Sequence, residues 1–411
     1  MEVKAGFKET EIGIIPEDWD LKSIDTIAKI EGGGTPSTQI DEYWDGQIPW
    51  ISAGDISNAK GRYVKETEFF ISELGLSNSP TKILPKDTTI IIARGATVGR
   101  MAQLGKDMAF NQTCYCLLPK DGLDKHYLYY SMLFSVNSII AMSYGTIFGT
   151  ITTNSFRDWF IPLPPLAEQE AIAEALSDAD ALIEALEQLL AKKRQVKQGA
   201  MQELLTGKKR VVKSGKWEVK RLGEIAEIVS GGTPSTRIAE YWNGDIDWCT
   251  PTDITSTEGK YLTHTEKRIT EAGLKNSSAN LLPKGALLLC SRATIGEVKI
   301  ATDRICTNQG FKSLICSDQV NNEFLYYIIL TLKPKLLEKG IGSTFLEISK
   351  KDTAAIEINL APFEEQTAIA EILSDMDAEI TALEAKLSKA REVKAGMMSE
   401  LLTGRIRLVE S

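Results

Sequence analysis

Apolar residues recur at alternating intervals of four and three positions along two long stretches of the chain, 166–207 and 363–404. This heptad spacing is typical of a helix that packs against another helix along much of its length. The first seam consists of Ile172, Leu176, Ala179, Ile183, Leu186 and Leu190, and the second of Ile369, Leu373, Met376, Ile380, Leu383 and Leu387. The stretches align without a gap and share 27 of 42 residues, which predicts two copies of one helix.

Both predicted helices carry boundary signals at matching positions. Pro165 and Pro362 precede them, where a missing N–H costs nothing, and Gly207 and Gly404 follow them, where a left-handed cap is favoured. About 40 residues, each rising about 1.5 Å, form a rod of roughly 60 Å. The obvious partner of each rod is the other, in an antiparallel coiled coil. The alternative, an ordinary amphipathic core helix, is usually half this length.

Between the helical stretches, short apolar runs bounded by turn residues predict buried strands. These runs come in three matching pairs, and a helical pattern of aromatic and aliphatic residues follows each set. The strands are 88–93 and 286–290, 98–104 and 296–301, and 113–118 and 311–316, and the helices are 126–140 and 322–337. We therefore expect each globular unit to be α+β, with a small, mostly antiparallel sheet.

The repeat covers the whole chain, in the order globular unit, rod, globular unit, rod. Residues 31–56 match residues 229–254 at 15 of 26 positions, with an offset of 198 that later becomes 197. Near-identical rods suit two copies of the same partner, related by a pseudo-twofold axis.

The globular units diverge in chemistry between their shared blocks. Phe69-Phe70 aligns with Lys267-Arg268, and residues 146–148 align with 343–345 in a corresponding loop. Divergent surfaces suit two different targets, whereas neutral drift around a common core is the alternative.

Composition narrows the class of protein. No apolar run reaches the roughly 18 residues that a membrane span needs, and the N-terminus has no apolar signal region. Six cysteines without metal-ligand spacing indicate free thiols in a reducing cytoplasm. The net charge is −9, of which −7 lies on residues 166–208 and 363–405, so the globular units are near neutral and can each hold a local basic face.

Several motifs together resemble the specificity subunit of type I restriction–modification systems. They are the duplicated GGTPST…YW.G.I.W…DI block, the helix entries IPLPPLAEQEAIA and INLAPFEEQTAIA, and the ELLTG endings. The resemblance implies two target-recognition domains, each reading one half of a bipartite, asymmetric double-stranded DNA site. It also implies that the helices separate these domains and dock two methyltransferase subunits, which restriction subunits join.

On this interpretation the chain divides into five segments. They are a first target-recognition domain (1–165), a first helical spacer (166–207), a second target-recognition domain (208–361), a second helical spacer (362–405) and a tail (406–411).

The candidates for DNA contact are polar residues in the shared blocks and basic residues that occur in the second domain only, Arg237, Lys267 and Arg268. Their hydroxyls suit phosphate or base edges, arginine suits guanine or phosphate, and the amides suit adenine. The candidates are Thr35, Ser37, Thr38, Arg94, Thr97, Asn111 and Gln112 in the first domain, and Thr233, Ser235, Thr236, Arg237, Lys267, Arg268, Arg292, Thr294, Asn308 and Gln309 in the second.

Each candidate also has a structural interpretation. The Gly-Gly-Thr-Pro-Ser-Thr segments lack a Gly-Lys-Ser/Thr ending, so they are not P-loops, but they can be purely structural turns beside the tryptophans, which we expect in the core. The arginines can form salt bridges, and the paired amides can satisfy the local backbone. Four basic residues on the rods, Arg194, Lys197, Arg391 and Lys394, are expected to meet partner helices or solvent.

Enzyme motifs for methylation, ATP binding or nuclease activity are absent, and the two histidines stand at unmatched positions. We therefore expect a non-catalytic subunit without a metal site, whose partners bind S-adenosylmethionine, ATP and Mg²⁺. The alternatives are a coiled-coil scaffold that binds protein only and a self-sufficient enzyme.

Overall fold

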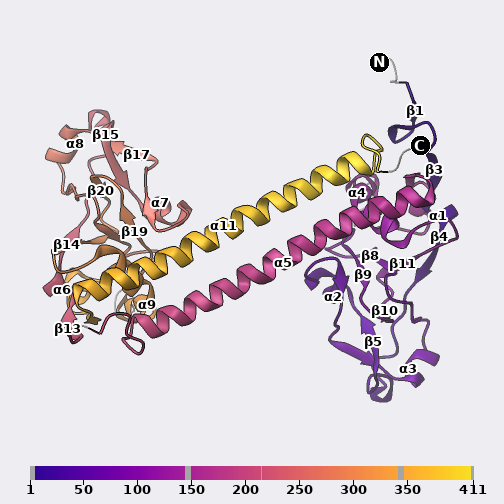
Figure 1. The fold of residues 1–411 in the computed structure, drawn as a ribbon, viewed down its shortest axis with the longest axis horizontal. Coiled ribbons are helices and arrows are strands. Elements are labelled where there is room, and N and C mark those ends of the chain that lie inside the picture. Colours follow the sequence, from indigo (N-terminus) through magenta and orange to yellow (C-terminus); the bar gives the residue numbers. More distant parts are fainter. Residues whose placement is uncertain (1–4, 144–149, 214, 341–346, 409–411) are drawn as a thin grey trace. The chain divides into compact units, whose positions relative to one another are not determined.

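The computed structural model describes residues 5–143, 150–213, 215–340 and 347–408. The chain forms two compact units, and both long helices contribute to each of them. The first unit lies within residues 1–188 and 386–411, and the second within residues 189–385. Each unit thus contains one globular domain and parts of α5 (Leu166–Leu204) and α11 (Phe363–Leu401), which are coloured magenta and yellow in Figure 1.

The globular domain of the first unit precedes α5. Its elements are β1 (Phe7–Thr10), β2 (Gly13–Pro16), β3 (Asp20–Ser23), α1 (Ile24–Ile27), β4 (Ala28–Gly32), η1 (Asp41–Tyr43), β5 (Ile48–Ile51), α2 (Ala53–Asn58), β6 (Tyr63–Val64), β7 (Phe69–Ile71), α3 (Glu73–Ser77), β8 (Thr89–Ile92), β9 (Met101–Leu104), β10 (Ala109–Phe110), β11 (Cys114–Pro119), α4 (Lys125–Ser143), η2 (Asn154–Phe156) and β12 (Phe160–Leu163).

Between α5 and α11 the second globular domain repeats the order of the first from β3 onward, with α10 in the place of η2. Its elements are β13 (Glu218–Arg221), α6 (Leu222–Ile225), β14 (Ala226–Ser230), η3 (Ala239–Tyr241), β15 (Trp242–Cys249), α7 (Pro251–Ser256), β16 (Tyr261–Leu262), β17 (Lys267–Ile269), α8 (Glu271–Lys275), β18 (Leu287–Leu289), β19 (Val298–Ala301), β20 (Ile305–Thr307), β21 (Lys312–Cys316), α9 (Asn322–Gly340), α10 (Lys350–Ala354) and β22 (Glu357–Leu360).

Each domain contains two main sheets where the sequence predicted one. The five-stranded sheets have the orders β4-β11-β8-β9-β6 and β14-β21-β18-β19-β16, and the three-stranded sheets β10-β5-β7 and β17-β15-β20. Among the described strands, parallel pairing is confined to β5–β10, β6–β9 and their counterparts β15–β20 and β16–β19. The prediction of α+β domains with mostly antiparallel pairing is confirmed, and so are the three strand pairs and the two helices α4 and α9.

Strand β8 shows why an unbroken apolar run forms a strand here. Successive side chains of a strand point to opposite faces of its sheet. Ile91 packs in the core that contains α4, whereas Ile90 and Ile92 pack in a second core with Ile51 and Phe110. Both faces of the strand are therefore buried, and no polar alternation is possible.

In each unit the two long helices run antiparallel and are linked by ion pairs. Lys394 pairs with Asp180 and Arg391 with Glu187 in the first unit. The second unit has the same two pairs displaced by 197 residues, between Lys197 and Asp377 and between Arg194 and Glu384. These basic residues were expected to meet partner helices or solvent, and in the structure they pair with the other long helix.

The predicted heptad seam is divided between two kinds of packing. Ile172 and Leu176 are fully buried in the domain core, together with Leu401 and Leu402 from the end of α11. Ile369 and Leu373 have the same environment in the second unit. These four residues thus pack with the end of the other long helix and also in the core of a globular domain, because the first turns of each helix close that core. Farther along, Leu190, Leu383 and Leu387 are buried, whereas Ile183, Leu186 and Ile380 are half-buried.

A buried glutamate near the start of each long helix forms an ion pair with an arginine that follows the end of the other long helix. We call this contact, together with a tryptophan that also bonds to the glutamate, the clasp. Glu168 is fully buried; it accepts hydrogen bonds from the Trp19 indole at 3.0 Å and from Arg407, which also pairs with Asp18 at 2.7 Å. Arg407 lowers the pKa of Asp18. A carboxylate that is removed from water needs such partners.

The second unit has the same clasp, formed by Glu365, Trp217 and Arg210. The Glu365 carboxylate accepts from the Trp217 indole at 2.8 Å and from Arg210 Nε at 2.8 Å. Burial by itself raises the pKa of Glu365, but the hydrogen bonds from Arg210 and Trp217 outweigh it, so the pKa lies below its ordinary value. The helix-entry motif therefore has a structural role that periodicity did not indicate.

The ends of the helices also explain where the N-terminal segment lies. Gly207 and Gly404 adopt φ values of 71° and 69°, as predicted for left-handed caps. A Cβ at Gly404 would lie 2.3 Å from Pro16 Cγ, at the end of the β1–β2 hairpin. The hairpin thus packs near the end of α11. Among the described residues, no helix is both long and apolar enough to span a membrane.

Candidate nucleic-acid interface

Three loops that carry predicted site residues meet in the second domain. The loop after β14 packs on the loop after β20, because Gly232 N donates to Thr307 O at 2.8 Å and the Thr233 hydroxyl donates to Gln309 Oε1. A Cβ at Gly231 would lie 1.9 Å from Asn308 O, so a side chain at this position would clash with the neighbouring backbone. This close approach is the physical reason for the glycine.

The third loop follows β18 and carries Arg292 and Thr294. Ser291 N donates to Gly310 O at 2.7 Å, and the Arg292 Cβ lies 3.9 Å from the position that a Cβ of Gly310 would take. Tertiary structure thus brings together predicted residues that lie more than 70 positions apart in the sequence, such as Thr233 and Gln309, whose separation is 76.

The first domain builds the same surface. Gly34 N donates to Phe110 O at 3.0 Å, the Thr35 hydroxyl donates to Gln112 Oε1, and Ala93 N donates to Thr113 O at 2.8 Å. The hydroxyl of Ser57, at the end of α2, lies 3.1 Å from that of Thr97. We call this set of loops (33–39, 94–100 and 111–113, with 231–237, 291–297 and 308–310 in the second domain) the loop surface.

Tryptophan side chains hold the Gly-Thr-Pro-Ser-Thr turns in place through hydrogen bonds from their indole N–H groups. Trp50 and Trp248 are 6% and 5% exposed and donate to Gly34 O and Gly232 O, each at 2.9 Å. Trp44 and Trp242 donate to the carbonyls of Ser37 and Ser235 at 3.0 and 3.1 Å. The prediction that Trp50 and Trp248 belong to the core is confirmed, whereas Trp44 and Trp242 are only half-buried. The turns hold Ser37, Thr38, Ser235 and Thr236 exposed.

The paired amides divide into a structural and an exposed member. Asn111 Oδ1 accepts from Thr113 N at 3.1 Å, and Asn308 Oδ1 accepts from Gly310 N at 2.8 Å. Both asparagine carbonyls therefore satisfy the local backbone, the structural interpretation of these residues. Gln112 and Gln309 are exposed.

The basic candidates of the two domains differ in their surroundings. Arg292 forms a salt bridge with Glu347 at 2.6 Å, and Arg268 pairs with Asp247 at 2.9 Å. Arg94 is exposed, as are Lys267 and Arg237, and within the described residues no salt bridge involves these three. The divergent loops 146–148 and 343–345 lie outside the described residues.

Phe69, on strand β7, lies beside the loop surface and was not among the candidates. Its ring packs edge-on against Trp44 and Trp50, with centroids 6.2 Å apart in each case, yet its side chain remains 42% exposed. Lys267 occupies the equivalent position of the second domain. The repeat alignment contained this signal, since an exposed aromatic residue and a lysine offer different contacts to a ligand.

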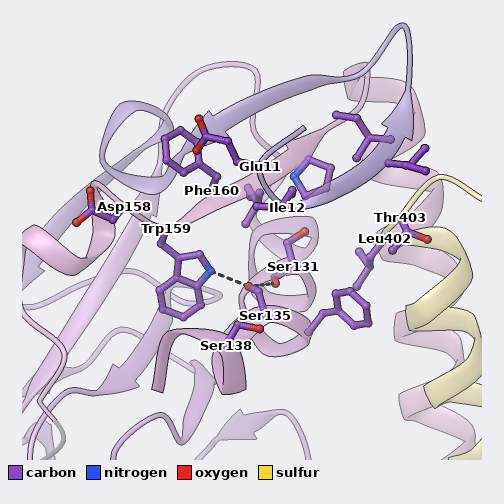
Figure 2. Close-up of a pocket in the computed structure, with 15 residues that line it drawn as sticks. Glu11, Ile12, Ser131, Ser135, Ser138, Asp158, Trp159, Phe160, Leu402 and Thr403 are labelled. Atoms are coloured by element: carbon purple, nitrogen blue, oxygen red, sulfur yellow. Dashed lines mark hydrogen bonds between the residues drawn. The ribbon is translucent and has the colours of Figure 1, made fainter. Parts of the chain in front are cut away.

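A separate cavity of about 470 Å³ lies in the first unit, between the β1–β2 hairpin, α4, β12 and the end of α11. Figure 2 shows Trp159, which donates to the Ser135 hydroxyl at 2.7 Å, and the acidic residues Glu11 and Asp158 at the rim. The described residues around this cavity include neither lysine nor arginine, so the cavity does not suit a phosphate group.

The joint between the first domain and α5 contains a buried arginine. The Arg62 guanidinium donates to Gln103 and Tyr130 and to Ser177 of α5, and its remaining edge faces Nδ1 of His126. Nδ1 accepts such a contact only when the imidazole is neutral. Burial first, and then the neighbouring guanidinium, lower the pKa of His126 below 6.5.

The second domain builds this joint with a carboxylate in the place of the imidazole. Lys260 replaces Arg62 and Glu323 replaces His126. The Lys260 ammonium pairs with Glu323 and donates to Ser374 of α11 at 2.6 Å. Burial alone raises the pKa of Glu323, but the bonds from Lys260, Tyr261 and Ser374 bring it below its ordinary value.

We expect the first joint to weaken in mild acid. As the pH falls below 6.5, the unfolded chain takes up a proton at His126 while the folded state resists it, so the folded state loses stability. His126→Gln keeps an acceptor and removes this titration. Its Tm should therefore fall less than that of the wild type between about pH 7 and about pH 5.

The control for this measurement is His264→Gln, which changes an exposed histidine and should follow the wild type. Asp87, Asp124 and Lys125 also face His126 and remain in every variant. Superimposable pH profiles for the wild type and His126→Gln would show that this joint does not respond to protons.

The chain belongs to the family described as type I restriction modification DNA specificity domain, whose model matches residues 16–196 and again residues 214–391. The type I restriction enzyme MjaIX specificity subunit of Methanocaldococcus jannaschii is 44% identical over 163 residues, which are 39% of this chain and 38% of that protein. The putative MjaX specificity subunit of the same organism is 27% identical and aligns over 98% of this chain and 97% of its own length.

A solved structure has the same fold. The S subunit of a type I restriction–modification system from M. genitalium superimposes with a TM-score of 0.61 over 98% of each chain, at 16% identity. The family resemblance and the fold class predicted from the sequence are therefore confirmed. The chain carries two DNA specificity domains, and each covers one globular domain and most of the helix that follows it.

Proposed function

We propose that this chain is the sequence-recognition subunit of a type I restriction–modification complex, and that each globular domain reads one half of a bipartite, asymmetric DNA site. One observation carries this proposal. Two copies of a DNA specificity domain share one framework, yet the side chains on and beside their loop surfaces differ, such as Phe69 and Lys267. A framework shared by the two domains would place both on DNA in the same way. Different exposed side chains would then let each domain recognise different bases.

The long helices would set the spacer between the half-sites and dock two methyltransferase subunits, through which restriction subunits join. Their 27 identical residues in 42 support two equivalent docking surfaces. This chain would contribute no catalysis, and S-adenosylmethionine, ATP and Mg²⁺ would be bound by the partners. The target adenine would leave the stack and enter a partner's pocket, since methylation of a base requires its extrusion from the duplex.

The test of this function is single-molecule sequencing of methylated adenines, in cells with and without the gene, beside its cognate methyltransferase. A split motif that disappears on deletion supports the proposal and identifies both half-sites. An unchanged methylome, with the partners expressed and active, would favour a scaffold that binds protein only.

Arg94→Ala is expected to relax recognition of one half-site and to leave the other intact. Arg94 is exposed on the loop surface of the first domain, where the loss of one arginine contact to a guanine costs about 1–3 kcal/mol. The measurement compares binding to duplexes that vary in the first or the second half-site. Equal loss at both halves would contradict separate readers.

A further inference from the structure

We propose that Glu347 competes with DNA for Arg292, so that the second domain must exchange an internal ion pair for a contact to DNA, which the first domain need not do. This inference rests on the proposed DNA-binding role of the loop surface. It makes the two domains unequal in affinity although they share one framework.

The geometry of the second domain is that of an occupied anion site. The Glu347 carboxylate lies 2.6 Å from Arg292 through one oxygen and 3.2 Å from Lys312 through the other. The Lys312 side chain is only 8% exposed, whereas that of Arg292 is 46% exposed and reaches the surface. The Arg292 guanidinium is the first cause of the lowered pKa of Glu347. A carboxylate held between two cations occupies the place that a phosphate oxygen would take.

The first domain has no carboxylate at the equivalent position. Glu347 and Lys312 correspond to Thr150 and Tyr115, neither of which is charged at neutral pH. Within the described residues, no acidic side chain forms an ion pair with Arg94, and the Arg94 side chain is exposed. The cation that corresponds to Arg292 is therefore available to DNA without an exchange.

A second charge in the same loop differs in the same direction. Arg100 of the first domain donates to the carbonyl of Ser57 at 2.8 Å, whereas its counterpart Glu297 is acidic and pairs with Lys333. The segment 94–100 carries two arginines and no acid, and the segment 292–297 carries one arginine and one glutamate. Both differences make the loop of the first domain the more attractive one for a polyanion.

Glu347→Gln should therefore increase the affinity of the full-length chain for DNA roughly three- to tenfold, because Arg292 no longer has to leave a charged partner. It should also steepen the salt dependence, by up to about one unit in the slope of log K against log salt concentration. Glu347→Thr, which installs the residue of the first domain, should have the same effect. The measurement is a titration of labelled duplex at several salt concentrations, with the thermal unfolding of every variant recorded.

The matched control is Glu357→Gln, which removes one negative charge from the same unit. Glu357 pairs with Arg221 on the β13–β22 sheet and shares no partner with the loop surface. In an Arg292→Ala background, Glu347→Gln should bring no gain, because the cation that it frees is absent. A gain that persists in that background, or one equal to the gain of Glu357→Gln, would show a general charge effect and overturn the proposal.

Failure of this inference can be separated from failure of the proposed function. Salt-dependent binding by the wild type, combined with unchanged or weaker binding by folded Glu347→Gln and Glu347→Thr, would overturn the role of Glu347 and leave DNA recognition intact. The absence of salt-dependent DNA binding by the wild type, alone and together with its methyltransferase, would overturn both.

Discussion

Insertion of one heptad into each long helix is expected to lengthen the preferred spacer between the half-sites and to abolish methylation of the native site. Seven residues add about 10 Å to a helix, which is the length of about three base pairs of DNA. The increase should not exceed about three base pairs, because each added base pair also rotates the second half-site around the duplex axis.

The structure indicates where the insertions belong. The boundary between the two units crosses α5 after Gln188 and α11 after Ala385, and these positions are equivalent in the repeat. Insertion there leaves the pairs Arg391–Glu187 and Arg194–Glu384 within their own units. Insertions of seven residues keep the apolar seam nearly in phase, whereas other lengths rotate it.

Sequencing of methylated adenines provides the measurement, since it reports the spacer directly. The control is insertion into α5 alone, which puts the two helices out of register and should abolish methylation without creating a new motif. An unchanged spacer in the double insertion would show that something other than the helices determines the separation of the half-sites.

Arg407→Ala is expected to destabilise the first unit strongly. The substitution leaves the fully buried Glu168 carboxylate with the Trp19 indole but without a cation. Removal of one partner from a buried ion pair costs about 3–5 kcal/mol, and solvent access to Arg407 reduces this to roughly 2–3 kcal/mol. Stability should be recovered in part by Glu168→Gln in the same chain, because a neutral amide does not need the cation.

Hydrogen exchange suits this measurement, since it reports the two units separately where a single melting temperature does not. Protection should be lost at the start of α5 and the end of α11, with the second unit unaffected. The control is Arg405→Ala, since Arg405 is exposed and pairs only with Glu400 among the described residues. Equal exchange in the Arg407→Ala and Arg405→Ala variants would show that the contact between Arg407 and Glu168 does not stabilise the first unit.

The sequence by itself determined the elements of this protein and their duplication. Heptad spacing located α5 and α11 because a helix buried along one side must repeat its apolar residues with the period of the helix. The run Thr88–Ala93 located β8 because a strand buried on both faces lacks the alternation of apolar and exposed polar residues. Gly207 and Gly404 marked the helix ends because their φ values are positive. These features depend on neighbours in the chain, so local pattern was sufficient.

Tertiary structure decided whether two side chains at matching positions of the repeat have the same surroundings. Arg94 and Arg292 have the same place in the repeat, but only a residue 55 positions away, Glu347, makes the second one part of an ion pair. Glu168 belongs to the first turn of a charged helix, and its burial follows from a tryptophan and an arginine at opposite ends of the chain. Such contacts join distant segments, and no local pattern encodes them, because a charge has the same sequence signature whether its partner is water or a buried side chain.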